Sequence, residues 1–445
     1  MVFGGGWGEQ AVVSDKIRTT EVKEMTSLRH RVSLVAAAAS VLLASSLAVV
    51  PALAAGPGTI TVGVFGDFTG SESFLGPDLT KGVATAVAAI NASGGVLGKK
   101  LTYVTADDAG DPVDAIPALR KLLSVNQPNF VVGPFSDIET AMVPIIKAST
   151  VPIIVQGGST QLDKITAPYF WRTNTSDDQE GSADAYWAIH NHWLRAAFAY
   201  TTAAGASTLM DPTRAAYEAH GGKVVVTENL VPDQSSYRSQ ILQIMAAHPQ
   251  VVFFQQDPQT AGTFFSEVAQ LGFDSKTEWL GTDVEFSSDV FKAIGPTVAT
   301  TNFQFTNNSL ESSPASRYFQ AWYQKVNHSS TPALAAPQGY DAVVVAALAM
   351  VAAHSTQGAV FNKYILKVAN PPGRPVYSFA QGAALLKKGI KINYSGVSST
   401  VDFNKYHNVV GPFGVYKFNK MGGFIQVGQI SSQANAKFFT PGTVH

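Results

Sequence analysis

The sequence predicts an α/β fold made of two doubly wound lobes, and three observations lead to that expectation. Apolar segments of strand length alternate with helix-length segments from residue 59 onward. The early strands end in polar loops rich in Gly, Ser and Thr, as is typical of the carboxyl edge of a parallel sheet. The chain has 445 residues, which is enough for two sizeable hydrophobic cores.

The first lobe opens with a buried-type strand at Ile60–Val64, a polar loop, and a helix that begins near Pro77. The Gly94-Gly95 turn leads to a second strand that ends at Asp107–Asp108. After another helix, the remaining strands of this lobe are expected at Phe130–Val132, Val151–Val155 and Phe170–Asn174.

A second strand–helix series begins at Ala196–Thr201, after a helix that Asp177 caps. Interdomain crossings are expected near Thr175–Ser176 and Asn302–Thr306. The other expected elements are a loop at Ala203–Ser207, strands at Lys223–Glu228, Val251–Phe254 and Glu278–Leu280, helices near Ser236–Ala247 and Pro337–Ala353, and a strand-rich end at Gly396–Asn404, Gly411–Asn419 and Gly423–Ile430.

These elements predict lobe I at residues 55–176 plus about 305–412, and lobe II at 177–304 plus about 413–445. Several chain crossings would form a hinge, and polar loops from both lobes would face the cleft between them. Closure over a small polar molecule would then be a hinge motion.

The composition excludes several classes of protein. Apolar residues make up 46% of the chain and charged residues only 14%, with a formal net charge of −1. This balance fits large buried sheets and argues against a nucleic-acid partner. There are no cysteines, and a large two-lobed core does not need disulfides.

Residues 1–54 predict a leader that contains a secretory signal over about 25–54. Arg29 and Arg31 form a basic start, Val32–Val50 is an Ala/Val/Leu/Ser run, and Ala52-Leu53-Ala54 supplies a small-x-small cleavage pattern. A membrane anchor is the alternative reading of the 19-residue run. Asp341–His354 is apolar over too short a stretch and is expected to be a buried helix.

The order and spacing of several motifs resemble those of type I periplasmic binding proteins of the leucine/isoleucine/valine class, the receptors of ABC importers. The resemblance continues weakly to about residue 432. It implies Rossmann-like lobes, a small-molecule ligand, an inner-membrane ABC permease as partner, a periplasmic location, a monomer and no cofactor. The motifs are Gly63–Gly70, Gly82, Ile90–Gly98, Asp107–Pro112, Val132-Gly133-Pro134 and Val151–Ile154.

Two loops of lobe I are the first candidates for ligand contact. Ser136 and Asp137 follow the third strand, and Gly157, Ser159 and Thr160 follow the fourth. Glycine permits close approach of the main chain to a ligand, and the resemblance implies a ligand-binding hydroxyl at Ser159. The structural alternative is that the serines and Asp137 only cap the helices that follow.

Asp137 departs from the family pattern, because relatives selective for amino acids usually carry Ser or Thr there. A carboxylate at this position would repel a ligand carboxylate in a dry cleft. Either Ser136 takes over that role, or the ligand is not an ordinary α-amino acid. Amides, urea-like compounds and aromatic acids, which relatives use, remain open.

Lobe II supplies Asp283, which lies where the family holds a ligand ammonium, and Asp257 as a weaker candidate at another strand end. Phe74 is a candidate apolar wall in the first loop. Tyr340 heads the apolar helix and is expected to pack near the hinge. Two acids facing one cleft would suit a ligand with a cationic or strongly donating group.

The sequence predicts a binding protein and not an enzyme. It has no nucleophile elbow or phosphate-binding glycine motif. His190 and His192 are two apart on a helix and do not face one site, so no metal site is expected. The alternatives are a sensor domain of the same fold that feeds a regulator, and a hydrolase that uses the cleft acids.

Overall fold

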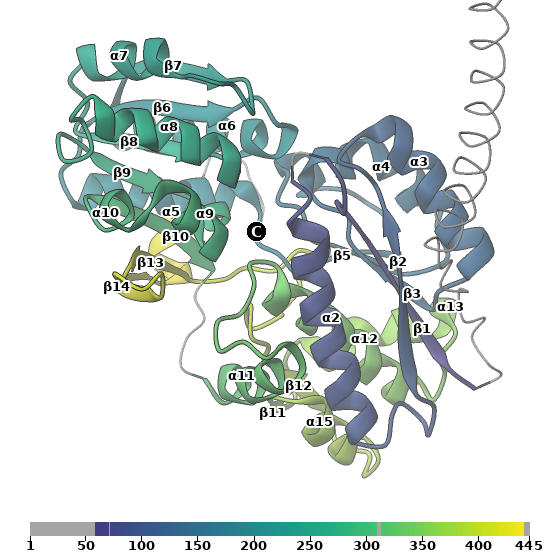
Figure 1. The fold of residues 1–445 in the computed structure, drawn as a ribbon. Coiled ribbons are helices and arrows are strands. Elements are labelled where there is room, and N and C mark those ends of the chain that lie inside the picture. The colour runs from purple at the N-terminus through teal and green to yellow at the C-terminus, as the bar shows by residue number, and fades with distance from the viewer. Residues whose placement is uncertain (1–57, 71, 309–312, 440–445) are drawn as a thin grey trace, which may run out of the picture. The chain divides into compact units, whose positions relative to one another are not determined.

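The computed structural model describes residues 58–70, 72–308 and 313–439 (Figure 1). The predicted leader and its cleavage site near Ala54 lie outside the described residues.

Lobe I is built on a five-stranded parallel sheet in the order β2-β1-β3-β4-β5. All seven residues of β1 are buried, as expected of a strand covered by helices on both faces. The bounds are β1 Ile60–Gly66, α2 Leu75–Ala92, β2 Leu101–Asp107, α3 Pro112–Lys121, β3 Phe130–Val132, α4 Ser136–Ala148, β4 Ile153–Val155 and β5 Phe170–Arg172.

A later part of the chain also packs on this sheet, through the contact of α12 with α2. Gly82 makes that contact possible, because a Cβ there would lie 2.1 Å from the carbonyl oxygen of Ala336. The elements of this part are α11 Pro314–Asn327, α12 Ala336–Ala353, α13 Gly358–Phe361, α14 Ile365–Ala369, β11 Arg374–Val376, α15 Phe379–Leu386 and β12 Ile392–Tyr394.

Lobe II is built on a seven-stranded sheet in the order β14-β13-β10-β9-β8-β6-β7, shown in teal and yellow in Figure 1. The strands from β6 to β10 are parallel, and β13 and β14 add an antiparallel edge. The bounds are α5 Asp177–His190, β6 Arg195–Thr201, α6 Ala204–Ala219, β7 Lys223–Leu230, α7 Arg238–Ala246, β8 Val251–Gln255, α8 Pro258–Gln270, β9 Glu278–Gly281, α9 Ser288–Ile294, α10 Pro296–Ala299, β10 Phe303–Asn308, β13 Phe413–Phe418, β14 Phe424–Ile430 and α16 Ser432–Asn435.

The predicted α/β class with two lobes is confirmed, and three local predictions are wrong. The expected loop at 203–207 contains the first turn of α6. The expected crossing near 302–306 is strand β10, which pairs with β9 and β13. The segment 396–404 contains no named strand, only a bridge between Phe403 and Val409.

The position of β10 bears on the domain boundaries. Because all of β10 belongs to the second sheet, we propose that lobe II extends to Asn308 before the chain returns to lobe I. The other crossings then lie between β5 and α5 and before β13, close to the predicted positions 176 and 412.

Helix α12 is the one described helix that is long and apolar enough to cross a membrane. Within the fold it is a core helix, with 89% of its apolar window buried against lobe I. The sequence-based expectation of a buried helix here is therefore confirmed.

A buried carboxylate, Asp341, ties α12 to the loop that follows β12. It accepts hydrogen bonds from the Tyr394 hydroxyl at 2.6 Å and from the N–H and hydroxyl of Ser398 at 2.8 and 2.7 Å. The Val397 N–H also donates to it, and Gly396 leaves room for the approach, since a Cβ there would lie 2.4 Å from the carboxylate. The predicted packing role of the Tyr340-Asp341 pair therefore includes a hydrogen-bonded anchor.

Replacing Asp341 with Ala should destabilise the protein by about 3 kcal/mol or more, because several buried donors would lose their acceptor. The free energy of unfolding in urea measures this effect. Tyr394→Phe removes only one of the bonds and should cost about 1 kcal/mol. A loss below about 1 kcal/mol for Asp341→Ala would contradict the anchoring role.

Candidate ligand-binding site

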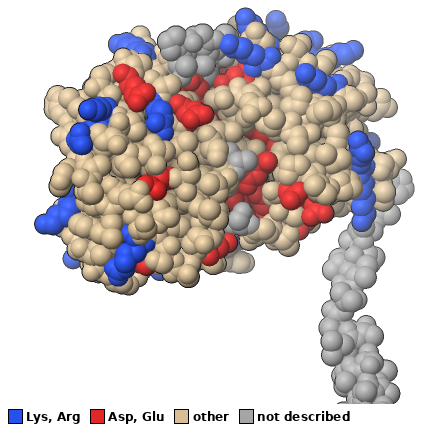
Figure 2. Space-filling view, turned by 90° about the horizontal axis from the view of Figure 1, so that it is seen from above, with Lys and Arg blue, Asp and Glu red and all other residues tan. Residues whose placement is uncertain are grey.

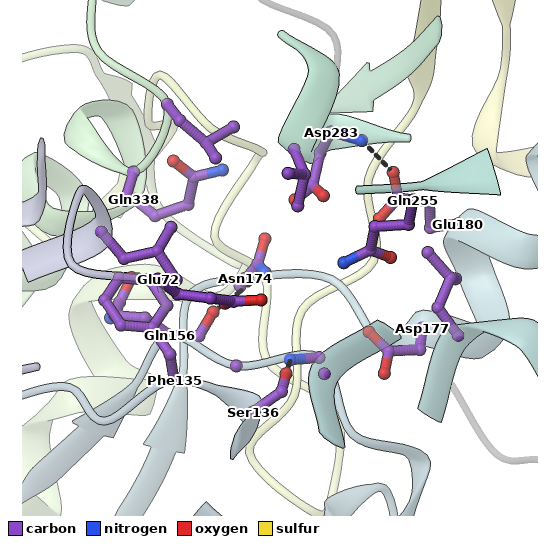
Figure 3. Close-up of a pocket in the computed structure, with 18 residues that line it drawn as sticks. Glu72, Phe135, Ser136, Gln156, Asn174, Asp177, Glu180, Gln255, Asp283 and Gln338 are labelled. Atoms are coloured by element: carbon purple, nitrogen blue, oxygen red, sulfur yellow. Dashed lines mark hydrogen bonds between the residues drawn. The ribbon is translucent and has the colours of Figure 1, made fainter. Parts of the chain in front are cut away.

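A cavity of about 620 Å³, which includes space open to solvent, lies where the strand ends of the two lobes meet (Figure 3). The part of it that water molecules can occupy is about 70 Å³. Lobe I lines it with Glu72, Leu75, Phe135, Ser136, Gln156, Gly157, Gly158, Asn174, Leu334, Ala335 and Gln338, and lobe II with Asp177, Glu180, Gly205, Leu209, Gln255, Asp283 and Val284.

The charged lining of the cavity is entirely acidic. Glu72, Asp177, Glu180 and Asp283 contribute carboxyl groups, and no Lys, Arg or His is among the described residues that line it. Figure 2 shows acidic side chains running through the middle of one face, with most basic side chains at its margins.

Helix α5 carries an acidic stripe on one face, because Asp177, Glu180 and Asp184 are spaced three and four residues apart. Each accepts a hydrogen bond from a neutral donor. The Thr208 hydroxyl donates to Asp177 at 2.6 Å, and the Thr306 hydroxyl to Asp184 at 2.7 Å. Glu180 accepts the backbone N–H of Asp283 at 2.7 Å. These bonds fix the side chains without neutralising them.

Burial in this acidic setting raises the pKa values of the lining carboxyls. Desolvation raises the pKa of Asp177 to about 7 and that of Asp283 to about 6. The pKa of Glu180 is raised well above its usual value by desolvation and then by Asp283. Glu72 is affected in the same direction by desolvation and by repulsion from Asp137. Below about pH 6, Asp177 and Asp283 therefore carry protons that a bound cation could displace.

Two further buried acids hold the loops that line the cavity. Glu139 accepts the N–H of Ser159 at 2.7 Å, and Glu285 accepts the N–H groups of Gln256 and Thr282 at 2.9 and 2.7 Å. Desolvation raises the pKa of both carboxyls to about 8. These acids act from behind the cavity wall by fixing strand-end backbone.

Gln255 and Gln338 extend toward the cavity from opposite lobes (Figure 3). Each has a buried Oε1 with no hydrogen-bond partner among the described residues. Asn174 lies between them, and its side chain donates to the Gln156 carbonyl at 2.9 Å. The site thus contains amide groups that remain available to a ligand.

Asp137 joins the two lobes and does not line the cavity. Its Oδ1 accepts the backbone N–H of Gly205, in the first turn of α6, at 2.6 Å. A helix N-terminus has unpaired N–H groups and favours a carboxylate. Asp137 is therefore a cap, as the structural alternative proposed, but the helix that it caps belongs to the other lobe.

The predicted site residues divide into two groups. Ser136, Gly157 and Asp283 line the cavity, whereas Phe74, Asp137, Ser159, Thr160 and Asp257 do not. Ser159 is fully buried and accepts the N–H of Gln161, Asp257 accepts the N–H groups of Gln259 and Thr260, and Phe74 packs against the core.

The polar lining residues that the sequence analysis did not propose include Glu72, Asp177, Glu180, Gln255 and Gln338. Asp177 was noted only as a helix cap. The usable signal was the spacing of Asp177 and Glu180 in the first helical turn after a predicted crossing, since that spacing places both on one face. For Glu72 and the glutamines, no comparable signal stands in the sequence.

Comparison with known proteins identifies the family. A family model described as "Periplasmic binding protein" matches residues 59–420. The Leu/Ile/Val-binding protein BraC3 of Rhizobium johnstonii is 29% identical over 278 residues, which cover 60% of this chain and 71% of that protein. An amino acid binding protein of Pseudomonas aeruginosa is 26% identical, covering 49% of this chain and 59% of the relative. The alignments thus span about two thirds of these curated relatives.

Solved structures share the fold. The leucine binding protein LivK of Thermotoga maritima aligns with a TM-score of 0.70 at 19% identity, covering 84% of this chain and 99% of that one. A solute binding protein of R. palustris in complex with benzoate aligns with a TM-score of 0.70 at 18% identity, covering 84% and 97%. At these identities the likeness shows the fold alone.

The ligand-free protein should lose stability as the pH rises from about 5.5 to about 8.5. The folded-state pKa values of Asp177, Glu139 and Glu285 lie above their usual values, so at lower pH the folded state binds more protons than the unfolded state. The free energy of unfolding that these protons contribute is lost as the pH rises through about 7 to 8. Urea unfolding at several pH values measures the fall.

The variant Asp177→Asn should reduce that fall by on the order of 2 kcal/mol, because one pKa unit corresponds to about 1.4 kcal/mol. Asp114→Asn, an exposed change of the same charge, serves as the control. Equal or greater stability at the higher pH in the wild type would contradict the acidic cavity described above.

Proposed function

Because the chain belongs to the periplasmic binding protein family, we propose that it is the extracytoplasmic solute-binding protein of an ABC importer. The two lobes, the cavity between their strand ends and the amino-acid-binding relatives support this role. The predicted secretory signal supports a periplasmic location, and an inner-membrane permease would be the partner.

The acidic lining carries the proposal for the ligand. Four carboxyl groups face a cavity whose described lining has no basic side chain, so a ligand carboxylate would be repelled. A protonated amine or guanidine would instead pair with Asp283 or Asp177 and displace the protons that they hold. We therefore favour a cationic or donor-rich nitrogen ligand, with amides next, over aromatic acids.

The rest of the lining indicates an amphipathic ligand. Leu75 and Phe135 from lobe I face Leu209 and Val284 from lobe II, so an apolar part of the ligand has a wall on each side. A zwitterionic amino acid could present its ammonium to Asp283. Its carboxylate would then need the backbone N–H groups at the start of α4, close to Glu72 and Asp177.

Hinge closure is the proposed mechanism of capture. The solute would bind the lobe I loops first and then bridge to Asp283 and α5 of lobe II. The Asp137 bond to Gly205 would form as the lobes meet, and the permease would distinguish the closed surface from the open one. In this scheme the protein binds and releases its ligand unchanged.

Ligand screening by thermal shift tests the proposed class. Alkyl and aryl amines, guanidines or amides should raise the melting temperature of the mature chain, and benzoate should not. Asp283→Asn should weaken binding of a hit tenfold or more, which corresponds to about 1.4 kcal/mol. Asp114→Asn, with the same charge change at an exposed position outside the lining, should leave the affinity unchanged.

The variant Ser159→Ala distinguishes ligand binding in the cavity from the ligand contact with the Ser159 hydroxyl that the sequence suggested. If the cavity is the site, the variant should retain most of the affinity, because Ser159 does not line it. Tight binding of benzoate with no response to amines, or unchanged affinity in Asp283→Asn, would overturn the proposed ligand class.

A further inference from the structure

A second acidic cluster lies beside the cavity. Asp67 follows β1, Glu72 precedes α2, and Asp137 stands in the first turn of α4. One carboxylate oxygen from each lies within 4.8 Å of the other two. Asp67 and Asp137 are outside the cavity lining, so the cluster shares only Glu72 with the solute site.

The burial of Asp67 is a second observation at this cluster. It is fully buried, and neither of its oxygens has a hydrogen-bond partner among the described residues. The neighbouring Asp108 is also fully buried, with one unpartnered oxygen. Buried carboxylate oxygens normally have partners, and leaving them unpaired carries a large desolvation cost.

Gly110 lies beside two of these acids. Gly110 has a φ of +63°, and a Cβ there would lie 3.8 Å from Oδ2 of Asp67 and 3.9 Å from Oδ2 of Asp137. The other oxygen of Asp137 is the one that accepts the Gly205 N–H, so its Oδ2 is left to face the cluster.

We propose that Asp67, Glu72 and Asp137 bind a calcium ion. Calcium prefers carboxylate oxygens at about 2.3–2.6 Å, so ligands on opposite sides of one ion lie about 4.6–5.2 Å apart. Three oxygens within 4.8 Å of one another meet that requirement. Magnesium demands shorter bonds and near-octahedral geometry, which three acids from separate loops supply less readily.

The position of the ion would couple it to lobe closure. Asp137 would hold the ion with one oxygen and the α6 N-terminus with the other, while Glu72 reaches the solute cavity. Calcium would keep both carboxylates ionised and reduce the repulsion among the cavity acids. This role goes beyond the proposed capture of an organic solute.

The competing account is a proton shared between Asp67 and Asp108. Desolvation and the neighbouring Asp108 carboxyl raise the pKa of Asp67 to about 11, so a proton shared by the pair would satisfy these oxygens without metal. The two accounts differ in one measurable respect, because only the calcium site predicts saturable calcium binding.

Calorimetric titration of chelator-treated mature protein with calcium chloride, without solute, tests the proposal. One ion per chain should bind, the melting temperature should rise, and magnesium should bind at least tenfold more weakly. Asp67→Asn should lower the calcium affinity at least tenfold, whereas Asp114→Asn, with the same charge change, should retain it. If Asp67→Asn does not fold in chelator, Glu72→Gln serves as the second variant.

Absence of saturable binding at millimolar calcium, or unchanged affinity in the folded variant, would overturn the site and leave the shared proton as the explanation. Amine binding measured in chelator tests the proposed function separately. Retained amine binding without any response to calcium would overturn the calcium site alone, while calcium binding without any solute response would overturn only the proposed ligand class.

Discussion

The cleft depends on one constraint: in the described part of the chain, its buried carboxyl groups have no buried cations that pair with them. Arg172, which pairs with Asp163, is the only fully buried cation among the described residues. The acids that line or support the cavity must therefore be compensated by protons, by backbone N–H groups or by a ligand. Compensation by protons corresponds to the raised pKa values, and compensation by the backbone to the hydrogen bonds from N–H groups.

The fold itself provides the backbone compensation. Parallel strands end at one edge of each sheet, and the helices that follow present their N-termini to the same edge. Asp177 and Glu180 stand in the first turn of α5, and Asp137 is in the first turn of α4 and caps α6. The architecture that forms the cleft thus also stabilises the carboxylates that lie in it.

The sequence predicted the fold well, because alternation of apolar strands and helices is a local pattern. The same pattern suggested Ser136, Gly157 and Asp283, which lie shortly after the ends of β3, β4 and β9 and line the cavity. For Asp137 and Ser159 it left open a ligand contact or a capping role. The structure pairs Asp137 with Gly205 of the other lobe, which no local pattern could predict, whereas the Ser159 hydroxyl accepts the N–H of Gln161 within its own loop.

The repulsion among these acids gives the protein a physical reason to respond to its ligand. In a closed, empty state Glu72, Asp177 and Asp283 are desolvated together, so closure without a ligand is penalised. A cation of the proposed class would remove this penalty only in the closed state, where both lobes would contact it. Its affinity for the closed form would then exceed that for the open form, and this difference would shift the population. The bond from Asp137 to Gly205 would add only about 1.5–3 kcal/mol to the closed form, so the proposed ligand would still shift the balance between open and closed forms.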